Sequence, residues 1–173
     1  MAIPGDEAMM YTADGLEHDV KGIPSAAVES HRKQLDKRAQ KLAEFNFGEN
    51  WAEISGEGNV AILCWGSVWA VANEAASQLR AKGQDVRVIA LRLLAPLRVN
   101  ALRKALSGVD KIIIVEQNHS AQFRGWIRAH IDLPCPHISL ALPGPLPIRP
   151  GQILQALEAF KQRREEVDNV ANC

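Results

Sequence analysis

The sequence has few cysteines and no net charge, and both shortages exclude classes of protein. Only three of its 173 residues are cysteine, too few for a disulfide framework and fewer than the four thiolates that an iron–sulfur cluster usually takes. Twenty basic residues balance twenty acidic ones, so the chain lacks the net basic surface that nucleic-acid binders use to displace counterions from phosphates. The composition predicts a protein of a reducing compartment, the cytoplasm, that binds no nucleic acid.

Long apolar runs and the common ligand-binding motifs are also missing. No stretch of about 18 apolar residues occurs, so no membrane span is predicted. The N-terminal MAIPGDEAMM lacks the basic region and apolar core of a signal peptide. There is no GxGxxG, no GxxxxGK[ST] and no HExxH, which argues against dinucleotide, P-loop and zinc sites. We therefore predict no catalytic, cofactor-binding or metal-ligating residue in this chain.

Short apolar runs alternate with helical patterns over most of the sequence. Strands are predicted over 59–65, 86–91, 111–115 and 137–142, and helices follow them over 68–82, 99–106, 120–131 and from Pro150 onward. Apolar runs of this length between amphipathic helices are typical of parallel strands that are covered on both faces. The pattern predicts an α/β fold with three layers, α/β/α, and a mostly parallel central sheet.

The first third of the chain has a different character. Residues 1–28 are rich in Gly, Pro and Asp and predict an extended arm with turns, while 29–45 predict a helix with a basic face. Residues 48–58, with three glycines, predict a linker. The expected domains are therefore an arm, basic helix and linker over 1–57, the α/β domain over 58–162 and a polar tail over 163–173.

Three motifs carry a family resemblance. They are GLEHD at Gly15–Asp19, CWGS at Cys64–Ser67 and VEQN at Val115–Asn118. In this order and spacing they resemble the α subunit of 2-oxoacid:ferredoxin oxidoreductases of the 2-oxoglutarate type, from about Ile3 to Phe160. The resemblance implies a transketolase C-terminal-like domain together with the linker that precedes it.

The resemblance also implies a function within a complex. Such complexes convert a 2-oxoacid and coenzyme A to acyl-CoA and CO2 and reduce ferredoxin, with thiamine diphosphate, Mg and iron–sulfur clusters. The usual GDG thiamine diphosphate motif with its distant Asn is missing here, so these cofactors are expected in partner domains. The implied role is a supporting, non-catalytic domain or split α subunit that contacts a thiamine diphosphate-binding subunit and meets ferredoxin only indirectly. A stand-alone small-ligand or anion-binding module and an inactive fragment are the alternatives.

Two motifs fall where parallel strands are expected to end. Gly66 and Ser67 could hold an anion at a helix N-terminus. A simpler interpretation is that Gly66 makes the turn and the Ser67 hydroxyl caps the helix. Glu116, Gln117 and Asn118 face the crevice where open α/β sheets bind ligands. We favour a structural or interface role over catalysis, in which Asn118 or Ser120 caps the next helix and Glu116 pairs with a neighbour.

The remaining candidates are Glu17, His18 and Asp19 in the arm. Their side chains could suggest a metal site, but consecutive residues of an extended segment point in different directions. A turn or a contact with another subunit is the favoured interpretation.

Overall fold

The structure is a computed structural model that describes residue 5 and residues 14–171, with side chains described as far as residue 162. The N-terminal part of the predicted arm, residues 1–4 and 6–13, lies outside the described residues. Contacts divide the chain into two compact units, Met1–Asn46 and Phe47–Cys173. Each unit is described by itself.

The second unit is built on a five-stranded sheet. Its strands are β1 (Ala52–Ser55), β2 (Val60–Trp65), β3 (Val86–Leu91), β4 (Lys111–Glu116) and β5 (His137–Ala141). The strand order is β1-β3-β2-β4-β5. β2 to β5 are parallel and β1 runs antiparallel to β3. The mostly parallel sheet predicted from the sequence is confirmed.

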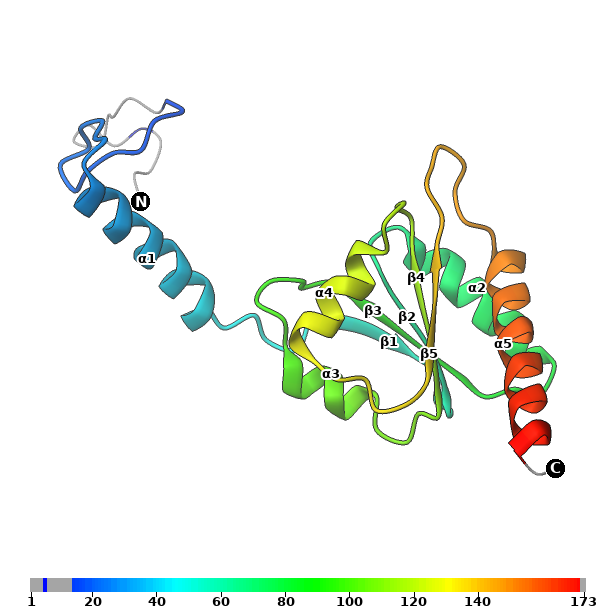
Figure 1. Cartoon of the computed structure of the whole chain (residues 1–173). Coiled ribbons are helices and arrows are strands. Elements are labelled where there is room, and N and C mark those ends of the chain that lie inside the picture. The colour runs from blue at the N-terminus through cyan, green and yellow to red at the C-terminus, as the bar shows by residue number, and fades with distance from the viewer. Residues whose placement is uncertain (1–4, 6–13, 172–173) are drawn as a thin grey trace. The chain divides into compact units, whose positions relative to one another are not determined.

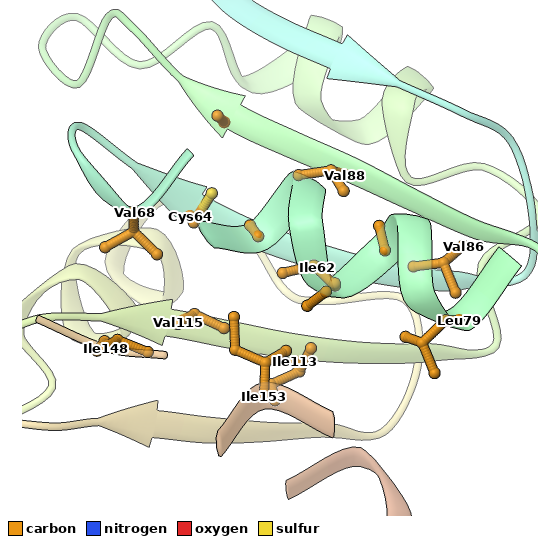
Figure 2. Close-up of a cluster of buried hydrophobic side chains, with 14 residues drawn as sticks. Ile62, Cys64, Val68, Leu79, Val86, Val88, Ile113, Val115, Ile148 and Ile153 are labelled. Carbon is orange, nitrogen blue, oxygen red and sulfur yellow. The ribbon is translucent and has the colours of Figure 1, made fainter. Parts of the chain in front are cut away.

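Helices cover both faces of this sheet (Figure 1). They are α2 (Val68–Ala81), α3 (Val99–Ala105), α4 (Gln122–His130) and α5 (Pro150–Ala171). The α2 and α5 side encloses one apolar cluster and the α3 and α4 side encloses the other. Figure 2 shows the first cluster, where Ile62 of β2, Val88 of β3 and Ile113 of β4 meet the residues of α2. In β2, β3 and β4 alternate side chains enter opposite clusters, so these three strands form nearly continuous apolar runs in the sequence.

The predicted linker over 48–58 is wrong in one respect, because it contains β1. This strand pairs with β3 from Ala52↔Leu91 to Ser55↔Val88, and the preceding Trp51 is only 7% exposed. Two of the three glycines that suggested a linker, Gly56 and Gly58, lie in the short connection from β1 to β2. Gly58 has φ +139°, and a Cβ there would lie 2.2 Å from the Asp85 carbonyl oxygen. A strand of four residues at the sheet edge buries too little to show a clear period.

The two ends of the chain also carry helices. α1 (Val28–Glu44) lies in the first unit and has no buried residue, and it confirms the helix predicted over 29–45. α5 continues to Ala171, so the helix predicted from Pro150 onward includes most of the residues expected to form a polar tail. None of the helices in the described part of the chain is long and apolar enough to cross a membrane.

Candidate functional site

The carboxyl ends of β2 and β4 bring two of the sequence motifs together. β2 and β4 are adjacent and parallel, so the residues that follow them lie at the same edge of the sheet. Gly66, Ser67 and Gln117 line one hollow of about 360 Å³ there, with Trp65, Val68 and Gly144. The crevice expected from the sequence is therefore present, and it includes three of the five candidate residues at this edge.

Ser67 does not cap α2 through its side chain. Gly66 makes the turn with φ +59°, as predicted. Ser67 occupies the position before the helix, but its backbone is already helical, with φ −64° and ψ −16°, and its side chain makes no capping hydrogen bond. A capping side chain needs an extended backbone to reach back to the first-turn N–H groups, so the predicted cap is wrong.

Glu116 is the only charged residue in the described part of the chain that is buried, with no exposed surface. One carboxylate oxygen accepts hydrogen bonds from Phe123 N at 2.6 Å and from the Asn118 side-chain amide, and the other accepts from Arg124 N at 3.0 Å. Phe123 and Arg124 belong to the first turn of α4. A carboxylate at this place satisfies free N–H groups and is favoured by the helix dipole. Glu116 therefore joins the end of β4 to the start of α4.

The two residues after Glu116 remain near the surface. Gln117 Nε2 donates to the Leu146 carbonyl at 3.1 Å, which connects the first hollow to the loop after β5. Asn118 Oδ1 accepts from Gln122 N at 3.4 Å, while its amide is held by Glu116. The predicted helix cap is thus shared, because Glu116 makes the short bonds and Asn118 adds a long one. No bond to α4 from the Ser120 side chain is among those described.

Tryptophans at this edge were not among the candidates from the sequence. Trp65, the last residue of β2, is 41% exposed and borders three hollows of about 360, 360 and 300 Å³. Trp126 of α4 is 38% exposed, and its indole Nε1 donates to the Leu94 carbonyl at 3.0 Å. Trp65 could have been identified from the sequence as a candidate interface residue, because it is an aromatic residue at the end of a buried apolar run and interfaces are enriched in Trp.

The GLEHD motif forms a small hairpin in the first unit. Asp19 N donates to Ile23 O at 2.9 Å and Ser25 N donates to Glu17 O at 3.0 Å, while His18 pairs with Pro24. The Asp19 carboxylate accepts from Lys21 N at 2.8 Å and Ile23 N at 3.0 Å. Asp19 is therefore a turn residue, as its short side chain allows.

Glu17 attaches this hairpin to α1. Its carboxylate lies 2.8 Å from His31 Nδ1 and 2.6 Å from Arg38 Nη2. These hydrogen bonds, first with His31 and then with Arg38, lower the pKa of Glu17 below its ordinary value. His18 Nε2 lies 3.4 Å from the Asp14 carboxylate. The carboxylates and the histidine of the motif thus turn to separate partners, and they do not converge on one point.

The residues described here do not fit the cofactors that the family resemblance implies. Within residue 5 and residues 14–162, whose side chains the structure describes, no three His, Cys, Asp or Glu side chains gather into a metal site. Burial raises the pKa of the Cys64 thiol to about 12, so it stays protonated and is a poor ligand for a cluster. Neither a Mg²⁺ ion for thiamine diphosphate nor an iron–sulfur cluster has a ligand set in this part of the chain.

A known family matches the part of the chain that forms most of the sheet. Residues 50–125 match the family described as the C-terminal domain of transketolase. This match begins just before β1 and ends within α4, so it includes the strands and turns that carry the CWGS and VEQN motifs. The body of the chain is therefore an α/β domain of the transketolase C-terminal type.

Over most of its length the chain is related to α subunits of 2-oxoacid:ferredoxin oxidoreductases. It is 29% identical to that of Saccharolobus solfataricus over 93% of this chain and 26% of the relative. It is 30% identical to that of oxidoreductase 2 of Aeropyrum pernix over 94% of this chain and 26% of the relative. The chain therefore spans about a quarter of the length of these relatives.

A solved structure agrees with these relatives. The 2-oxoglutarate:ferredoxin oxidoreductase from Magnetococcus marinus, with 2-oxoglutarate, coenzyme A and succinyl-CoA bound, superposes with a TM-score of 0.68 at 29% identity. The superposition covers 92% of this chain and 28% of that one. The family resemblance that the three motifs carry in the sequence is confirmed.

Proposed function

We propose that the chain is a supporting, non-catalytic domain of a 2-oxoacid:ferredoxin oxidoreductase. The complex would convert a 2-oxoacid, and specifically 2-oxoglutarate, with coenzyme A to acyl-CoA and CO2, and would reduce ferredoxin. The observation that carries this proposal is a similarity to such proteins over 92–94% of the chain, which takes in most of the arm as well as the domain. A likeness confined to the fold would leave the function open.

The chemistry of this reaction belongs to cofactors that other domains would bind. Thiamine diphosphate supplies the electron sink for decarboxylation, and iron–sulfur clusters carry the electrons away. The residues of this chain would contribute shape and contact, since its one buried carboxylate, among the described residues, is occupied by the backbone of α4. A thiamine diphosphate-binding subunit or domain is accordingly the proposed partner.

The carboxyl edge of the sheet is the surface that we assign to this partner. Exposed Trp65 and Trp126 lie there together with Leu146, which is 72% exposed. Aromatic residues at partly exposed positions are typical of the centre of protein interfaces. Gln117 and Asn118 border the same hollows and can offer their remaining amide groups to a loop of the partner.

The chain alone is expected to show no decarboxylation of 2-oxoglutarate or pyruvate. The assay would contain thiamine diphosphate, Mg²⁺, coenzyme A and an artificial electron acceptor. With every reagent present, a lack of turnover can be assigned to the protein itself. Release of labelled CO2 and reduction of the acceptor are the measurements. Turnover that depends on thiamine diphosphate would contradict the proposed supporting role.

Replacing Glu17, His18 and Asp19 together by Ala is expected to weaken assembly with the thiamine diphosphate-binding partner. The change removes the attachment of the hairpin to α1 and the turn bonds of Asp19. The melting temperature of the second unit should stay within about 2 °C of the parent, since exposed substitutions outside the core have small effects.

A pull-down titration of the partner measures this loss. Glu44→Ala is the matched control, because Glu44 is an exposed carboxylate of the first unit whose described contact is the Gln40 side chain. The control should bind like the parent. Equal binding by the triple variant and the parent would show that the hairpin is a spacer and takes no part in assembly.

A further inference from the structure

Two arginines of α4 and a histidine of β5 form a basic cluster, in which the arginine charges act on the histidine. Arg124 and Arg128 are one turn apart on α4, on the side of the sheet that holds Phe123 and Ile127. His137 begins β5, an edge strand. Its neighbour Ile138 packs on the opposite side, toward α2 and α5, so the alternation along the strand puts His137 on the side of α4.

Two nitrogen atoms of this cluster are buried without a hydrogen-bond partner. They are Arg124 Nε and His137 Nε2. Among the described residues, no other buried side-chain nitrogen or oxygen atom lacks a hydrogen-bond partner. The His137 imidazole makes a hydrogen bond to the backbone of Cys135. This bond must involve Nδ1, because Nε2 has no partner. Buried polar groups of native proteins are nearly always paired, and an exception calls for an ion, a water or a ligand.

The two charges that act on the pKa of His137 are both positive. Desolvation is the largest influence that lowers the pKa of His137, and the positive charges of Arg124 and then Arg128 lower it further. The opposing influence is the backbone of Cys135, and the β4 residue paired with His137 is the apolar Ile112. No carboxylate pairs with either guanidinium within the described part of the chain.

We infer that Arg124, Arg128 and His137 form a binding site for a small oxyanion, a carboxylate or a phosphate group. Guanidinium groups present parallel N–H donors that match two oxygens of such a group, and charge-assisted bonds of this kind are the stronger ones in proteins. An oxyanion would supply the acceptor that Arg124 Nε lacks and would favour a proton on His137 Nε2. Nothing in this site takes part in the proposed function, so the inference goes beyond it.

The imidazole of His137 gives a direct readout of binding in the 173-residue chain. Sodium phosphate and sodium acetate are titrated in parallel, with sodium chloride at matched ionic strength as the screening control, and the NMR signals of His137 are followed over a range of pH. We expect the pKa of His137 to rise, on the order of one unit, with a saturable dependence on the oxyanion. The NMR signals of His119, an exposed histidine, serve as the internal reference for the effect of ionic strength.

Variants identify the side chains responsible. Arg128→Gln removes an exposed charge without touching the core, and it should raise the half-saturating concentration at least about tenfold. Arg103→Gln is the matched control, since Arg103 is an exposed arginine of α3, and it should leave binding unchanged. Arg124→Gln tests the second guanidinium, because the bond that Arg124 makes to Glu116 is a backbone bond that this change retains.

The outcomes separate the sources of the anion. Saturation with phosphate alone assigns a phosphate ligand, and saturation with acetate assigns a carboxylate. If the pKa of His137 rises no more with phosphate or acetate than with chloride, the proposed site is wrong. An equal loss of binding in Arg103→Gln and Arg128→Gln would contradict the site as well, because it would mean that only net charge matters.

Discussion

Replacing Ile113 by Asp is expected to abolish the cooperative melting transition of the domain. Ile113 lies in β4 and pairs with Ile62 of β2 on one side and Ile138 of β5 on the other. It has no exposed surface. A carboxylate here would lose its hydration without gaining a partner, at a cost of several kcal/mol. That cost is comparable with the whole stability of a typical domain, about 5–15 kcal/mol.

The control for this experiment is the same change on an exposed strand position. Ile54 lies on the edge strand β1 and is 48% exposed, so Ile54→Asp should cost no more than about 1 kcal/mol. Circular dichroism melts of both variants and the parent provide the comparison. A melting temperature of Ile113→Asp within a few degrees of the parent would be incompatible with a central β4.

The second large effect is expected for Glu116→Ala. Removal of the carboxylate leaves Phe123 N, Arg124 N and the Asn118 amide without their acceptor. Each buried donor that loses its partner costs about 1–3 kcal/mol, so the total should be about 3 kcal/mol or more. For a chain of this size that corresponds to a fall in melting temperature of roughly 10 °C.

Glu74→Ala is the matched control for the loss of a carboxylate. Glu74 is an exposed residue of α2 that bonds the Gln78 side chain, and its loss should shift the melting temperature by no more than a degree or two. Amide hydrogen exchange adds a local measurement, since Phe123 and Arg124 should lose protection in Glu116→Ala first. If their protection is unchanged, the carboxylate does not hold the start of α4.

The sheet could be predicted from the sequence because its strands are buried on both faces. Two strands can be recognised as apolar stretches between helices, β4 by its run of isoleucines and β2 by the run VAILCW. β1 could not be recognised in this way. Its side chains are partly buried or exposed without a regular alternation. The strand is held by backbone pairing to β3, which leaves little trace in composition.

The candidate site was predicted less well than the fold, because hydrogen-bond partners depend on distances that a sequence does not contain. The three motifs selected Glu17 and Glu116, but not the partners of their carboxylates. His31 and Arg38 lie far along the chain from Glu17, while α4 reaches Glu116 through a loop of a few residues. Arg124 and His137 belong to no motif, and only the burial of one side-chain nitrogen in each distinguishes them.

The bonds of Glu116 have a consequence for how this edge of the sheet can change over time. The carboxylate joins the end of β4 to the start of α4 through backbone N–H groups, and Asn118 is the loop side chain that is seen to add bonds to this connection. Ala121, with its left-handed φ of 52°, is held in place by the bonds on either side of it. The surface residues Gln117 and His119 can therefore be exchanged without unfolding the sheet. Specificity for a partner and stability of the core can evolve separately here, and a designer could vary this loop while keeping Glu116.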